Sequence, residues 1–162
     1  MIQLRNLSYL VALCLIISSQ AWCKADIELR GTLINITCKI GSKEKHEVDF
    51  GKEVVAQLLD GKHYKEDLPL LITCNEEYSG DLNFTIRGKV SSFEETAVET
   101  NITGLGIRFI DNNSGKMLEI DKPHKYKDGE MLSLGVVPVK APDATFTGGD
   151  FLAVAVLELE PQ

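Results

Sequence analysis

The chain has 162 residues, of which 44% are hydrophobic and 25% are charged, and its formal net charge is −7 at pH 7. This length predicts one domain once an export segment is set aside. The acidic balance argues against a nucleic-acid partner, because phosphates need a basic surface.

The N-terminal residues are typical of a secretory signal peptide. Arg5 is the one charge before an apolar run over residues 7–17, and small polar residues follow it. About 11 apolar residues are too few to span a bilayer core, which needs about 20. The charged start, short apolar core and small-residue exit therefore predict an exported protein.

Two cleavage points fit the small-residue pattern, one after Ala21 and one after Ala25. The cut after Ala25 is favoured, because the other would leave Cys23 as an odd thiol in an oxidising compartment. We therefore expect residues 1–25 to be the signal peptide and residues 26–162 to be the mature domain, with no membrane span.

Cys38 and Cys74 are the cysteines that remain in the mature chain. An even pair in an exported protein predicts a disulfide. It would close a loop of about 35 residues, which the chain-entropy account rates at roughly 3–4 kcal/mol. A metal site is disfavoured, because the chain has no CxxC spacing and no histidine cluster beside these thiols.

Period-two hydrophobicity in short runs predicts strands along the mature chain and no long amphipathic helix. A polar segment separates the predicted strands at residues 82–87 and 105–110, and a turn over residues 111–115 follows the second of these. The predicted strands cover residues 27–38, 46–51, 68–74, 82–87, 105–110, 131–139 and 151–159, with one helical turn within 54–59.

Many short strands separated by turn signals predict an all-β sandwich of immunoglobulin type. The last predicted strand is strongly apolar, and the sequence stops three residues after Leu159. A long apolar edge strand is an aggregation hazard that monomeric proteins cover. We therefore expect an incomplete sandwich that lacks its last strand and borrows one from a partner.

Several segments resemble the pilins of the chaperone–usher pathway, especially the minor and tip-adaptor subunits of type 1 and P pili. The resemblance covers the mature chain. It is carried by residues 26–33, the first cysteine at 38, Val-Asp-Phe-Gly at 48–51, Leu-Leu-Ile-Thr-Cys at 70–74, residues 100–107 and Val-Pro-Val-Lys at 137–140.

The C-terminal segment is the most specific part of the resemblance. It has the glycine expected 14 residues from the end, but its penultimate residue is Pro161 where the family has an aromatic residue. That departure bears on how the last residue pair docks on a chaperone. The glycine and the alternating apolar residues are Gly149, Phe151, Ala153, Ala155, Leu157 and Leu159.

The resemblance implies donor-strand complementation, a form of β-strand addition. A periplasmic chaperone would lend a strand beside the last strand, and at the outer-membrane usher the N-terminal extension of the next subunit would replace it. Residues 26–33 would be this chain's donor strand, with Ile27, Leu29 and Leu33 inserting side chains and Gly31 allowing close approach. The implied protein is a minor or adaptor subunit of a surface fimbrium that contributes to cell adhesion.

Catalytic and cofactor chemistry finds no support in the sequence. His46, His63 and His124 are scattered without metal-ligand spacing, and no Gly-x-Ser-x-Gly elbow is present. We therefore expect neither an enzyme, a metal site nor a cofactor. Two alternatives stay open at this point, a secreted receptor- or glycan-binding module and a pilus-terminating subunit that cannot accept the next donor strand.

Overall fold

A computed structural model describes residues 27–41, 45–75, 80–127 and 129–162. Within these residues the regular structure is almost entirely β. The elements are β1 (Cys38–Ile40), the 3-10 helix η1 (Ala56–Leu58), β2 (Glu66–Cys74), β3 (Leu82–Gly88), β4 (Val90–Ser91), β5 (Glu94–Glu99), β6 (Leu105–Asp111), β7 (Lys116–Met117), β8 (Pro123–Tyr126), β9 (Met131–Lys140) and β10 (Ala155–Pro161).

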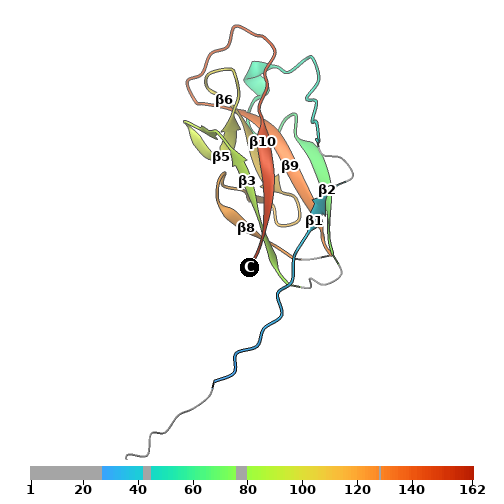
Figure 1. Cartoon of the computed structure of the whole chain (residues 1–162). Helices are drawn as coiled ribbons and strands as arrows, with labels where there is room; N and C mark the ends of the chain where they lie inside the picture. The colour runs from blue at the N-terminus through green and yellow to red at the C-terminus, as the bar shows by residue number, and fades with distance from the viewer. Residues whose placement is uncertain (1–26, 42–44, 76–79, 128) are drawn as a thin grey trace, which may run out of the picture. The chain divides into compact units, whose positions relative to one another are not determined.

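The strands form two antiparallel sheets. The larger has the order β1-β2-β9-β6-β5-β4, with β7 also paired to β6, and the smaller has the order β10-β3-β8. Figure 1 shows β10 and β3 side by side in front of the sheet that contains β2 and β9. Residues Ile34–Gln162 make up this sandwich, and residues before Ile34 belong to a separate unit.

The core lies between the two sheets, because alternate residues of each strand point inward. On β3 the inward residues Leu82, Phe84 and Ile86 are at most 3% exposed. From the larger sheet the facing residues include Leu70, Ile72, Ile107, Phe109, Leu132, Leu134 and Val136.

Four strands follow the sequence-based prediction closely. β2 and β3 begin within two residues of the predicted starts, and β6 and β9 each run one residue past the predicted ends. The predicted helical turn is also present, as η1. In β2 the buried residues alternate with exposed ones, whereas β9 is recognised by a continuous apolar run that is buried on both faces from Leu134 to Val139.

The prediction was wrong for the first two strands. Residues 27–37 form no strand, and ladder pairing begins at Cys38. The second predicted strand, residues 46–51, also lacks ladder pairing, although Val48 and Phe50 pack against the core. An alternating pattern records which side chains face an apolar surface, and it does not require a neighbouring strand within the chain.

Short strands within the polar segments were missed. The predicted polar segment after β3 contains β4 and β5, and the segment between the predicted strands at 105–110 and 131–139 contains β7 and β8. These strands bury few residues, namely Ser91 of β4, Ala97 and Val98 of β5, and Tyr126 of β8. Their pairing is therefore fixed by backbone hydrogen bonds that leave little trace in side-chain hydrophobicity.

The last strand also differs from the prediction, because it begins at Ala155 and not at Phe151. Residues 151–154 continue the chain toward β10 without ladder pairing.

Candidate functional site: a groove between two strand edges

β10 lies at the end of the smaller sheet and pairs on one side with β3. The Gln162 amide donates to the Asp81 carbonyl, which continues the register in which Pro161 lies opposite Leu82. In an antiparallel pair the residues alternate between bonding the partner strand and pointing away from it. The backbone groups of Ala155, Leu157 and Leu159 therefore point to the other edge, where no strand of the described residues is paired.

β1 lies at the corresponding end of the larger sheet and pairs with β2. The Asn75 amide donates to the Thr37 carbonyl and the Gly41 amide donates to the Leu71 carbonyl, so alternate residues bond β2. The same alternation leaves the backbone groups of Cys38 and Ile40 directed to the outer edge of β1. β1 and β10 thus each present a strand edge without a paired neighbour among the described residues, as do the opposite end strands β4 and β8.

An apolar hollow lies between the edges of β1 and β10. Its volume is about 480 Å³, comparable to a small-ligand site, yet no charged side chain lines it. The residues that line it are Ile34, Ile36, Cys38, Ile40, Leu82, Leu159 and Pro161. We call the space between the edges of β1 and β10, including this hollow, the groove.

The predicted C-terminal site residues lie along one side of the groove. Phe151, Ala153, Leu157 and Leu159 pack against the core, and the Phe151 ring lies 5.8 Å from the ring of Phe50. Ala155 falls on the same side of the strand by alternation but is exposed. Gly149, the remaining residue of this set, has a φ of +133°, which favours glycine.

The predicted donor residues lie in the other unit, where they form no ladder strand. Ile27, Leu29 and Leu33 are 80%, 88% and 100% exposed. Gly31 has no neighbouring atom within 4 Å of the position that a Cβ would take. Three large apolar side chains at alternate positions are thus left without an apolar environment in the structure.

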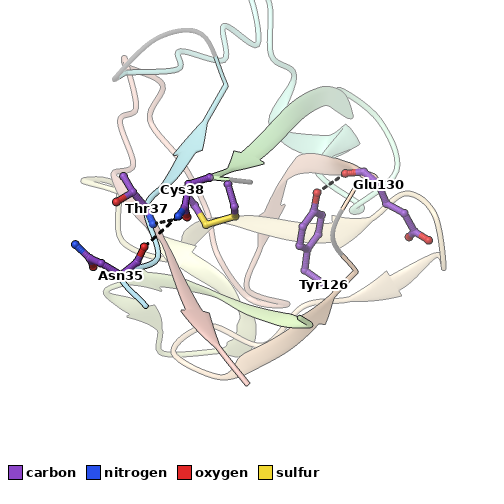
Figure 2. Close-up of a disulfide and its surroundings, with 7 residues drawn as sticks. Asn35, Thr37, Cys38, Tyr126 and Glu130 are labelled. Carbon is purple, nitrogen blue, oxygen red and sulfur yellow. Dashed lines mark hydrogen bonds between the residues drawn. A yellow bond between two sulfur atoms is a disulfide. The ribbon is translucent and has the colours of Figure 1, made fainter. Parts of the chain in front are cut away.

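The β1 side of the groove is held by a disulfide at Cys38, which Figure 2 shows beside Asn35 and Thr37. It is also held by the Asn75 side chain. Cys38 and Cys74 are opposite each other across β1 and β2, and they form the predicted disulfide. Beyond it, Oδ1 of Asn75 accepts from the Thr37 amide at 3.1 Å, and Nδ2 donates to the Asn35 carbonyl at 3.1 Å. The amide of Asn75 therefore extends the pairing of β2 by one step along residues 35–37.

The β10 side is held in a similar way by Asn101. Its backbone amide donates to the Leu152 carbonyl, its Oδ1 accepts from the Leu152 amide at 2.6 Å, and its Nδ2 donates to the Asp150 carbonyl at 3.2 Å. These bonds take the place of a ladder just before β10 begins.

Sequence reasoning missed the role of both asparagines. Asn101 lies in a segment that carried the family resemblance, but its partners are about 50 residues away in the chain. Asn75 follows the second cysteine and bonds residues about 40 positions earlier. Nothing local marks such contacts, and only the register of the strands brings them together.

An ion pair on the outer face joins β10 to β3. The Arg87 guanidinium donates to the Glu158 carboxylate at 2.7 Å, across the two strands. This bond raises the pKa of Arg87 above its ordinary value. Because both side chains of the pair are about half exposed, we assign it a role in orienting the strand edge and only a small contribution to the stability of the fold.

The described part of the chain contains no group of three or more His, Cys, Asp or Glu side chains that could hold a metal ion. None of its helices has the length and hydropathy needed to cross a membrane.

Comparison with known proteins identifies the family. A family model described as fimbrial protein matches residues 27–162. The uncharacterized fimbrial-like protein YfcQ of Escherichia coli strain K12 is 26% identical over 96% of this chain and 98% of that protein. The uncharacterized fimbrial-like protein YfcR of the same strain is 29% identical over 72% of this chain and 69% of that protein.

Solved pilus subunits share the fold. The P pilus rod subunit PapA superposes with a TM-score of 0.63 at 25% identity, over 85% of this chain and all of PapA. The P pilus adaptor subunit PapF superposes with a TM-score of 0.58 at 21% identity, over 77% of this chain and 95% of PapF. The predicted incomplete immunoglobulin-like sandwich is thus confirmed. The chain belongs to the fimbrial protein family and is a structural subunit of a chaperone–usher type pilus, not an enzyme.

Proposed function

We propose that this chain assembles by donor-strand exchange, with the groove accepting an extended strand from another protein. The observation that carries the proposal is the pair of strand edges, on β1 and β10, that flank one apolar hollow. A strand laid between them would bond the outward backbone groups of Leu157 and Leu159 on one side and of Cys38 on the other. Its inward side chains would cover the partly exposed core.

The donor in this proposal is the N-terminal extension of the next pilus subunit, and segment 26–33 of this chain represents such a donor. Its alternating side chains match what an edge-to-edge strand must supply, since one face enters the groove and the other meets water. Ile27, Leu29 and Leu33 supply the apolar face, and the charged Glu28 and Arg30 lie on the other. Asp26 lies outside the described residues, as does the proposed signal peptide over 1–25.

The proposal extends to the assembly route. The signal peptide directs the chain to the periplasm, a pilus chaperone fills the groove there, and an outer-membrane usher exchanges that strand for the next subunit's donor. The finished subunit takes a minor or adaptor place in a surface fimbrium that serves adhesion. The open hollow favours a subunit that accepts a donor over one that terminates the filament.

The first test is dependence on a chaperone. We would express residues 1–162 in a bacterial periplasm with and without a pilus chaperone and separate the soluble species by size-exclusion chromatography. The proposal predicts a stable 1:1 complex, and little soluble chain when the chaperone is absent, because the groove exposes apolar surface. A stable monomer without the chaperone would contradict it.

The second test supplies the missing strand covalently. We define the donor-fused chain as the full chain followed, after Gln162, by a short flexible linker and a second copy of the sequence of residues 26–33. It should be a soluble monomer without a chaperone. A matched control replaces by Asp the appended leucine that corresponds to Leu29. That control should lose solubility, because it buries a charge in an apolar groove.

A further inference from the structure

Pro161 lies in β10 beside the hollow, at a position where a strand edge normally offers a hydrogen-bond donor. It pairs in register with Leu82, and the Gln162 amide bonds the Asp81 carbonyl. Residue 161 therefore belongs to the alternate set whose backbone groups point away from β3 and toward the groove. Proline has no N–H, so this edge position carries a carbonyl acceptor alone.

The remaining donors of the edge can be counted from the same register. Ala155, Leu157 and Leu159 direct N–H groups into the groove, and the next position in the alternation, Pro161, directs none. The ring of Pro161 lines the hollow instead, next to Leu159 and Leu82. At this end of the groove β10 thus offers an apolar side-chain contact in place of a backbone N–H donor.

We propose that Pro161 is a specificity-determining residue that removes the last N–H donor from the ladder between β10 and the incoming donor strand. The inference rests on the proposed function and deepens it. Beyond Leu159 the donor-strand carbonyl finds no N–H on β10, although the Pro161 carbonyl can still accept a bond, so an apolar side chain in the hollow contributes more to holding this end. The sequence-independent part of the donor strand's affinity, which comes from backbone hydrogen bonds, is reduced there. The identity of the donor side chain that enters the hollow therefore has a larger effect on binding.

The test compares the natural chain with Pro161→Val, which restores the N–H and keeps an apolar residue of similar size. Each full chain would be prepared as its complex with a pilus chaperone. A synthetic peptide with the sequence of residues 26–33 would then replace the chaperone. In a series of peptides, one backbone amide at a time is changed to an ester, which weakens one carbonyl acceptor and removes the N–H of the following residue.

The inference predicts that Pro161→Val binds the unmodified peptide roughly 2- to 10-fold more tightly, the value of one added backbone hydrogen bond. It also predicts one ester position that weakens binding to the variant more than binding to the natural chain. The ester opposite Leu159 should weaken binding to both and serves as the internal control. Peptide binding with the same affinity and the same ester profile in both proteins would overturn this inference alone. Failure of either protein to bind any peptide would overturn the proposed function with it.

Discussion

Asn101 and Leu152 bond each other in both directions, although 51 residues separate them in the chain. The Asn101 backbone amide donates to the Leu152 carbonyl at 3.1 Å, and the Leu152 amide donates to the Asn101 side-chain oxygen at 2.6 Å. The side-chain nitrogen adds a bond to the Asp150 carbonyl. One residue thereby does what a short stretch of strand would do, and it fixes where β10 starts.

Asn101→Ala removes the two side-chain bonds and leaves the backbone bond. We expect it to lower the free energy of unfolding of the donor-fused chain by about 1–2 kcal/mol, measured by urea denaturation. Asn101→Asp keeps an acceptor for the Leu152 amide and should lose less. Asn113→Ala, which removes one exposed bond to the Met131 carbonyl, is the control. Equal small losses for Asn101→Ala and Asn113→Ala would show that Asn101 does not hold the groove.

Gly61 lies in a tight turn against the Arg108 guanidinium. Its φ is +78°, and a Cβ there would overlap Nη1 of Arg108. Gly51 has a similar φ of +82° but no neighbour within 4 Å. Gly51→Ala should therefore cost only the backbone term, about 1 kcal/mol. Gly61→Ala should cost more, because Arg108 must also move, and thermal unfolding of the donor-fused chain measures the difference. Equal costs would contradict the close packing of this turn.

Glu94 and Arg108 form a bidentate ion pair whose side chains are only about one-fifth exposed, at 21% and 20%. Burial tends to raise the pKa of Glu94, but hydrogen bonds from Arg108 and Thr96 outweigh it and hold the pKa below the ordinary value of 4.5. A lowered folded-state pKa means that the pair stabilises the fold above about pH 4.5. The contribution is lost as the pH falls through the folded-state pKa.

The resulting prediction is a drop in the urea midpoint of the donor-fused chain on acidification from about pH 5 to about pH 3. Glu94→Gln should reduce that drop, because its side chain does not titrate. The variant should also be less stable than the natural sequence at neutral pH, since Arg108 loses its charged partner. A drop of the same size in both proteins would assign the acid sensitivity to other carboxylates.

The disulfide ties the β1 side of the groove to β2 across a sequence separation of 36 residues. The double substitution Cys38→Ala and Cys74→Ala should lower the free energy of unfolding of the donor-fused chain by roughly 3–4 kcal/mol, the loop-entropy value for a loop of this size. Guanidinium denaturation under oxidising conditions measures it. A loss under about 1 kcal/mol would mean that β1 is held mainly by its hydrogen bonds to β2.

Particular residues show how far the sequence predicts the fold and where it fails. The buried alternation of Leu82, Phe84 and Ile86 predicts β3 correctly, because one face meets the core and the other does not. The equally regular residues 27–33 form no strand, since an alternating pattern does not say which chain provides the neighbour. The bonds of Asn75 and Asn101, and the edge position of Pro161, depend on strand register, which no local pattern contains.

The most direct test of strand addition is residue-resolved amide hydrogen exchange by NMR on the donor-fused chain. The amides of Val156, Glu158 and Glu160 bond β3 by register and should be protected in any case. The amides of Ala155, Leu157 and Leu159 point into the groove and have no strand partner within the described residues of the chain. The account predicts that all six are protected to a similar degree. Fast exchange at Ala155, Leu157 and Leu159 beside slow exchange at the other three would contradict it.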